Sequence, residues 1–228
     1  MSEIAETDRT RLRREPERGV FDRAEVHAII DAAVHCHLGF VGPDGQPFVI
    51  PTIHGRVGDE LYVHGSAASR MMRYLSGGAP VCCTITHVDG IVVARSTFWS
   101  SMDYRSVVIL GAARAVTDDA ERRAALDAII DRLLPGRVGE VRPPTAKELA
   151  ATKVIALPIS EASAKVRAGD PEDDPSDLEG PAWAGVIPLV PSWGEPRPAA
   201  NLTAGIAVPA SVQRRLETPP GRVPPHAE

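Results

Sequence analysis

The feature that most constrains this chain is a series of short apolar runs separated by turn residues. From Cys36 onward the sequence passes through CHLGFV, PFVIPTIHG and ELYVHG, with Gly-Pro-Asp-Gly and Val-Gly-Asp between them. Further on come VCCTITHV, IVVARST, YRSVVILGAARAV, KVIALPI and SAKVR. Apolar runs of this length, bounded by Gly, Pro and Asp, are typical of antiparallel strands, and Asp89-Gly90 favours a tight hairpin turn. The pattern predicts a barrel or a sandwich.

Local capping signals place a few helices around these strands. Asp22 and Asp118 each stand three residues before a glutamate, and apolar residues then recur at helical spacing. A short helix is expected over residues 66–75, before the Gly77-Gly78 pair, and another after Thr145. The chain is therefore predicted to be mainly β with peripheral helices, an α+β fold.

The length of 228 residues and the hydrophobic content of 43% suit one domain with a full core. Residues 1–20 are charged and are expected to form an N-terminal arm that orders only against something else. Residues 21–200 are expected to form the domain. Residues 201–228 are rich in Pro and Ala, so we expect a tail that runs loosely over the surface.

Charge and composition exclude several kinds of partner and site. The net charge of -5 lacks the basic surface that nucleic-acid binding requires. No run approaches the roughly 20 apolar residues of a membrane span, and the N-terminus does not resemble an export signal. Cys36, Cys82 and Cys83 cannot all pair and form no C-x-x-C motif, so we expect neither a disulfide framework nor a metal site. A cytoplasmic protein is expected.

Residues 61–73 form the most informative local segment, in which a strand runs through Gly65 and Ser66 into a helix. Backbone N–H groups at a helix start, with the hydroxyls of Ser66 and Ser69 and the guanidinium of Arg70, make a suitable cradle for a phosphate. The alternative is that Ser66 only caps the helix and Arg70 is only a solvated side chain. The residues themselves leave both open.

Two further segments are candidates for ligand contacts. Arg105 and Ser106 stand at the mouth of an apolar strand, where an arginine could clamp a phosphate or could simply face water. Pro51 interrupts a strand because it has no N–H, which is typical of a sheet edge or of backbone facing a ligand.

Four histidines could carry chemistry but form no recognisable set. His35 and His37 flank Cys36 and project to one face of a strand, where they could bind a metal or a haem iron or could lie half buried at a helix end. His54 and His64 could likewise face a ligand or mark strand ends. No Ser-His-Asp or Cys-His arrangement can be inferred.

Taken together, the segments RTRLRREPERGVFD, CHLGFVGPDGQPFVIPTIHG, LYVHGSAASR, DYRSVVILGAAR, EVRPPTAKEL, SAKVR and WAGVIPL resemble the pyridoxamine 5'-phosphate oxidase-like flavin-nucleotide-binding proteins. The resemblance spans residues 9–210 and includes the nitroimidazole-resistance proteins as distant relatives. It implies a six-stranded antiparallel split β-barrel of the FMN-binding type. It also implies a homodimer that binds two FMN molecules between its subunits.

The resemblance also assigns cofactor contacts. Ser69-Arg70 matches the family's phosphate-binding element, and Arg105-Ser106 matches its Arg-Gln strand start, with serine in place of the glutamine. Trp183 resembles an aromatic residue that reaches the site of the partner. Only WAGVIPL stands where true pyridoxamine phosphate oxidases carry substrate-binding arginine and histidine, so that reaction is not expected. The complete predicted set is Val49, Ile50, Pro51, Thr52, His64, Gly65, Ser66, Ser69, Arg70, Arg105, Ser106 and Trp183.

The resulting prediction is an FMN-dependent oxidoreductase that passes hydride or electrons from a nicotinamide donor to a small acceptor. The cofactor itself carries such chemistry, so no acid-base pair is required and no catalytic residue is assigned. The alternatives are a haem-binding or haem-handling protein, a non-catalytic flavin-binding protein, or a protein that uses deazaflavin F420.

Overall fold

Two antiparallel sheets form the centre of the structure, a computed structural model that describes residues 2–222. The larger sheet has the strand order β1-β10-β7-β6-β2-β3 with β11 paired to β6, and the smaller has the order β4-β5-β9-β8. The strands are β1 (Gly19–Val20), β2 (Cys36–Val41), β3 (Pro47–Thr52), β4 (Gly55–Val57), β5 (Glu60–Ser66), β6 (Pro80–Val93), β7 (Ser101–Ala112), β8 (Arg114–Ala115), β9 (Thr152–Pro158), β10 (Ala162–Arg167) and β11 (Gly185–Pro188).

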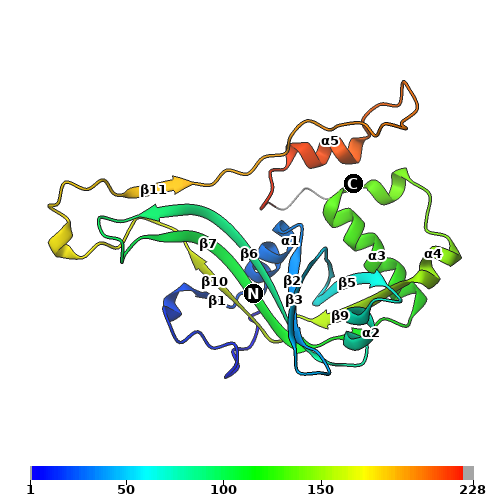
Figure 1. The fold of residues 1–228 in the computed structure, drawn as a ribbon, viewed down its shortest axis with the longest axis horizontal. Helices are drawn as coiled ribbons and strands as arrows, with labels where there is room; N and C mark the ends of the chain where they lie inside the picture. The colour runs from blue at the N-terminus through cyan, green and yellow to red at the C-terminus, as the bar shows by residue number, and fades with distance from the viewer. Residues whose placement is uncertain (1, 223–228) are drawn as a thin grey trace.

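Helices lie around these sheets (Figure 1). They are α1 (Arg23–Ala32), α2 (Arg70–Leu75), α3 (Asp119–Leu133), α4 (Ala146–Ala151), α5 (Ala210–Glu217) and the short 3-10 turns η1 (Pro16–Arg18), η2 (Arg137–Glu140) and η3 (Pro175–Asp177). Buried side chains from both sheets, among them Leu38, Val63 and Ile109, meet in one apolar core with α1 and α2. The predicted α+β class and the split-barrel fold are confirmed.

The helix starts follow the capping chemistry expected from the sequence. The carboxylate of Asp22 accepts a hydrogen bond from the N–H of Glu25, and that of Asp118 accepts from Glu121. Thr145 forms a complete capping box ahead of α4. The expected helix over residues 66–75 is shorter than predicted, because Ser69 rather than Ser66 caps it and α2 begins one residue later.

The expected hairpin turn at Asp89-Gly90 is wrong. β6 continues through these residues to Val93, and its register with β7 shifts at a β-bulge between Val88 and Gly90. The apolar residues after Gly90 keep pairing with β7, so the connection falls at residues 94–100 instead. Bulges bend and twist a strand pair. β6, β7 and β11 together form a long arm that projects away from α3 and α4 (Figure 1).

The run PFVIPTIHG, expected as one strand, divides between the two sheets. β3 ends at Thr52 in the larger sheet, and β4 begins at Gly55 in the smaller one. A Cβ atom at Gly55 would lie 2.6 Å from the backbone nitrogen of Ile129, so only glycine lets α3 approach the strand this closely. The glycine at the end of the run therefore positions a helix rather than a turn.

The described parts of the two terminal segments, residues 2–20 and 201–222, make more contacts than their composition indicates. In the N-terminal arm, Ile4 is buried in the core and Arg9 forms an ion pair with Glu161. In the expected loose tail, residues 210–217 form α5, where buried Arg215 donates to the carbonyl of Leu133 at 2.6 Å. A few anchoring side chains thus order a segment of low apolar content. Within residues 2–222, no helix has the length and apolar character needed to cross a membrane.

Candidate functional site

The predicted flavin residues on β3 lie at the open edge of the larger sheet. β3 pairs only with β2, so its outer edge has no partner strand among the described residues. Val49 is 69% exposed, and Pro51 is exposed opposite His37. Ile50 and Thr52 are half buried on the other face. Because backbone groups on this edge are not used by the sheet, Val49 to Thr52 remain available to a ligand.

Ser66, Ser69 and Arg70 are brought together at the start of α2. The hydroxyl of Ser66 accepts from the N–H of Ala68 at 3.2 Å, and that of Ser69 accepts from Met72 at 3.5 Å. The guanidinium of Arg70 lies 5.0 Å from the ring centre of Phe48 on β3. Arg70 forms no ion pair within residues 2–222, so its charge is not neutralised by a neighbouring carboxylate there.

Arg105 and Ser106 do not join this cluster. Residues 105 and 112 are about 23 Å apart along β7 at roughly 3.3 Å per residue, and α2 connects to the Pro80 end of β6, which pairs with Ala112. Arg105 instead donates twice to Asp89, at 2.8 and 2.7 Å. Ser106 donates to the carbonyl of Lys165 at 3.3 Å. The candidate contacts therefore form two separate groups within one chain, one with Ser66, Ser69 and Arg70 and the other with Arg105 and Ser106.

Trp183 also lies far from α2 along the chain's own sheet. It precedes β11, whose first residue Gly185 pairs with Val93, at the opposite end of β6 from Pro80. Trp183 is 65% exposed, and its ring covers Gly185, where a Cβ atom would lie 3.0 Å from the indole. Trp183 cannot reach the α2 cluster of its own subunit.

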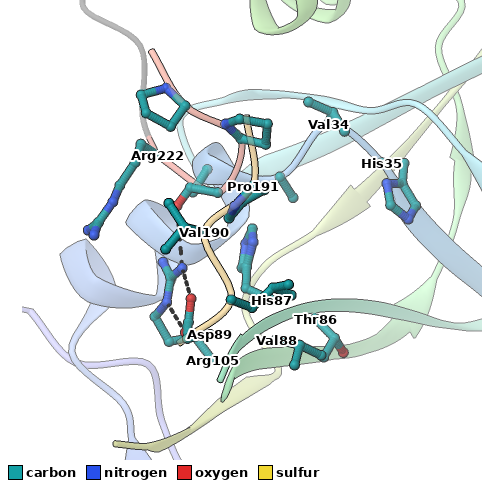
Figure 2. A pocket seen from close by; sticks show the side chains of 16 residues that line it. Val34, His35, Thr86, His87, Val88, Asp89, Arg105, Val190, Pro191 and Arg222 are labelled. Carbon is teal, nitrogen blue, oxygen red and sulfur yellow. Dashed lines mark hydrogen bonds and ion pairs between the residues drawn. The ribbon is translucent and has the colours of Figure 1, made fainter. Parts of the chain in front are cut away.

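Arg105 lines a cavity of about 380 Å³ under the C-terminal segment. Figure 2 shows Arg105 and Asp89 joined by their ion pair, with Val190 and Pro191 nearby and His35 across the cavity. The hydrogen bond from Arg105 lowers the pKa of Asp89, so both groups stay charged. The opposite charges of Arg105 and Asp89 satisfy each other, and Arg222 also lines this cavity.

His87 lines the same cavity and has its own partner. Its Nε2 lies 3.0 Å from the carbonyl of Ile29 at the end of α1. Burial lowers the pKa of His87 and outweighs the opposing effect of its hydrogen bond to Ile29. The ring is therefore a neutral hydrogen-bond donor that ties α1 to β6.

A larger cavity, of about 830 Å³, lies between β5, α3 and the segment that leads through η2 to α4. It falls within the size range of small-molecule and cofactor sites. Its wall is mainly apolar and includes Leu126, Ile130, Leu134, Val138, Val141 and Leu149. Sequence reasoning missed this cavity, although the stripe on α3 and the apolar residues scattered through residues 134–149 were visible.

His64 faces this cavity from β5. Its Nδ1 atom is buried without a hydrogen-bond partner in the described structure, and its side chain makes no hydrogen bond within residues 2–222. Burial lowers the pKa of His64, so the imidazole is neutral at neutral pH. An unpartnered polar atom in an apolar wall is costly unless a ligand satisfies it.

α3 is held over β5 by a polar contact at its first turn. The hydroxyl of Tyr62 donates to Glu121 at 2.9 Å, and Arg114 donates to both oxygens of the same carboxylate. Burial and the hydrogen bond to Glu121 raise the pKa of Tyr62 to about 12, so the phenol keeps its proton. These contacts hold α3, which forms one wall of the cavity, in place next to β5.

Gly65 has a packing role. A Cβ atom there would lie 2.8 Å from Cγ of buried Met72, so glycine allows α2 to pack closely against β5.

The other candidate histidines are placed less favourably for binding a ligand. His54 is fully buried, and its Nε2 lies 3.1 Å from the carbonyl of Ile30. His35 and His37 contact each other edge to face with ring centres 5.3 Å apart, on the exposed side of β2. Cys36 between them points into the core and is buried. Within residues 2–222, no three His, Cys, Asp or Glu side chains cluster as metal ligands.

Comparison with known proteins agrees with this architecture. The model of the pyridoxamine 5'-phosphate oxidase family matches residues 22–166. The structure is similar to a flavocytochrome from Azotobacter vinelandii, with 39% identity, a TM-score of 0.86, and coverage of 91% of this chain and 96% of that one. It is equally similar to the FAD and haem binding protein from Mycobacterium smegmatis, with 40% identity, a TM-score of 0.85, and coverage of 90% and 99%.

A more distant likeness shows the fold alone. A candidate 5-nitroimidazole antibiotic resistance protein from Bacteroides thetaiotaomicron has 24% identity and a TM-score of 0.54, over 65% of this chain and 86% of that one. No curated protein matches the chain. The extent of the family match and the two similar structures agree with the predicted resemblance. The chain therefore belongs to the pyridoxamine 5'-phosphate oxidase family, whose flavin-binding split barrel it shares.

Proposed function

We propose that this protein is a flavin-dependent oxidoreductase that also binds haem and works as a cytoplasmic homodimer. The observation that carries the flavin part is the unneutralised Arg70, grouped with Ser66 and Ser69 beside the open edge of β3. The haem part is supported by the two similar proteins, one a flavocytochrome and the other an FAD and haem binding protein.

The proposed flavin site fits the chemistry of a phosphate attached to an apolar ring. Arg70, Ser66 and Ser69 would hold the phosphate, and the backbone of Val49 to Thr52 with Gly65 would lie beside the ring. A bound flavin supplies hydride and electron transfer, while the protein supplies orientation and polarity. Arg105 and Ser106, which already have partners, are not assigned to the phosphate.

The proposed homodimer would allow Trp183 to contact a flavin, which it cannot do within its own subunit. The arm formed by β6, β7 and β11 exposes apolar side chains, including Ile91 at 50% and Ile187 at 55%. Exposed apolar surface of this kind is typical of protein interfaces. In the dimer, Trp183 would reach the flavin bound by the other copy. The unpaired cysteines are compatible with a reducing cytoplasm.

The absorption spectrum of the protein purified without added cofactor tests the proposal. Paired flavin bands and a Soret band are expected together. The mass of the released flavin distinguishes FMN, which the family resemblance implies, from FAD, which the similar mycobacterial protein binds. Bleaching of the flavin by NADH or NADPH and its reoxidation by a quinone or nitro compound would support the oxidoreductase role. A colourless protein that rejects both flavins would refute the flavin part.

Replacement of Arg70 tests the phosphate assignment. We expect Arg70→Ala to weaken flavin binding roughly 10- to 100-fold, because a charge-assisted hydrogen bond to phosphate is lost. Arg73→Ala is the matched control, since Arg73 is an exposed arginine on the same helix. Titration of the flavin-free protein by fluorescence quenching measures both affinities. Equal losses in the two variants would show a general effect of charge and remove Arg70 from the site.

A further inference from the structure

We propose that the 830 Å³ cavity between β5, α3 and α4 is the haem site and that His64 is the protein ligand of its iron. This inference rests on the proposed function, because it locates the haem that the proposal requires. Neither the family match nor the names of the similar proteins assign a residue or a cavity to haem.

The first argument is the state of the His64 side chain. An iron ligand must be a neutral imidazole with a free ring nitrogen. His64 has a buried nitrogen without a hydrogen-bond partner, and its side chain lines the cavity. His54 is occupied and enclosed in the core, and His87 donates to Ile29. Among the histidines of residues 2–222 that line the two cavities, His35 is the remaining alternative.

The second argument is the polarity of the cavity wall. Haem is a large apolar macrocycle with two carboxylates at one edge, so it needs an apolar slot with cations at one rim. Leu126, Ile130 and Val138 supply apolar surface. The smaller cavity at Arg105 and Asp89 has less than half this volume, about 380 Å³.

The third argument is a cation at the cavity that has no acidic partner. Three arginines, at positions 123, 137 and 142, line the cavity. Arg137 pairs with Glu140 at 3.2 Å, and Arg142 pairs with Glu148 at 2.7 Å. Arg123 forms no ion pair or hydrogen bond within residues 2–222, so it is suited to bind a carboxylate of the haem. An apolar wall, an unpartnered imidazole and an unneutralised arginine thus meet in one cavity.

The test is haemin titration of the flavin-loaded protein, followed by the Soret band and by the ratio of haem to protein. We expect His64→Ala to lower haem affinity at least tenfold and to shift the Soret maximum. His35→Ala is the matched control and should bind haemin like the unmodified protein. The variant His64→Gly separates loss of the ligand from loss of the fold. Added imidazole should restore its Soret maximum only if a ring nitrogen of His64 had bound the iron.

A second variant tests the cavity independently of the ligand. Val141 is 44% exposed at the wall, so Val141→Trp should fill part of the space without disturbing the core. We expect at least a tenfold loss of haem affinity with flavin retained. An unchanged Soret band in both variants, or its loss in His35→Ala alone, overturns this site while haem binding itself stands. No Soret band in the unmodified protein refutes the haem part of the proposed function instead.

Discussion

Arg70 and Arg105 are both candidate phosphate contacts in the sequence, but they have different partners in the structure. Arg70 is exposed and only stacks on Phe48, whereas Arg105 donates to both oxygens of Asp89. An arginine that is already neutralised gains little from a phosphate, because its existing ion pair must first be broken. This difference in available charge is why we propose Arg70, and not Arg105, as the phosphate contact.

His87 should make the stability of the cofactor-free protein depend on pH. Burial lowers its pKa in the folded state, so the unfolded chain binds a proton more readily. Stability is therefore complete above the unfolded pKa of about 6.5 and falls as pH decreases below it, by at most about 1.4 kcal/mol per pH unit for one group. We expect His87→Gln, which keeps a donor for Ile29, to flatten this slope between pH 7.5 and 5.5. Urea denaturation at several pH values measures it, and an identical slope in the variant would contradict the assignment.

At the scale of helices and strands, local chemistry predicted the element starts and long-range contacts decided their ends. Asp22, Asp118 and Thr145 were identifiable as caps because their partners lie three residues away. Asp89-Gly90 was not identifiable as a bulge, because the same dipeptide favours a turn when no neighbouring strand continues the pairing. A helix cap can be predicted because all of its residues lie within one short segment. A bulge cannot be predicted in this way, because it depends on the pairing with another strand.

α5 offers a test of how a polar helix is held in place. Buried Arg215 donates to the carbonyls of Leu133 and Arg132 and stacks on Trp193. Cations at a helix C-terminus satisfy its unpaired carbonyls and its dipole. We expect Arg215→Ala to lower the free energy of unfolding by about 2 kcal/mol and to speed proteolysis between β11 and α5. Gln213→Ala, an exposed change on the same helix, should do neither, and equal behaviour of the two variants would show that Arg215 is not the anchor.

At the scale of the whole molecule, the family and the split barrel were predictable, but the division of the site was not. The ordered series of segments identified the fold, which the family match and the two similar structures confirm. The sequence gives no distance between Ser69 and Arg105, which the structure places in two separate groups within one chain. The cavity at His64 was missed because α3, η2 and α4 enclose it only after they pack on β5.

A single charged residue placed on the projecting arm tests whether the arm forms the dimer interface. If the arm forms the dimer interface, Ile91→Glu should give a monomer in analytical ultracentrifugation and should also lower flavin content, because Trp183 would lose its place on the other copy. Val57→Glu is a matched control, since Val57 is 45% exposed on β4, outside the arm. A dimeric, fully loaded Ile91→Glu protein would place the interface elsewhere.

The long segment between β11 and α5, residues 189–209, contains no helix or strand and is exposed almost throughout. It nevertheless ends on a helix that binds η2 and the end of α3 through a few polar contacts. α5 therefore behaves as a tethered ligand, and a flexible tether gives an effective concentration of up to about millimolar. Such a helix needs only weak intrinsic affinity to remain docked. The same peptide supplied free in solution would leave its site largely empty, and a single cut in the tether would release it.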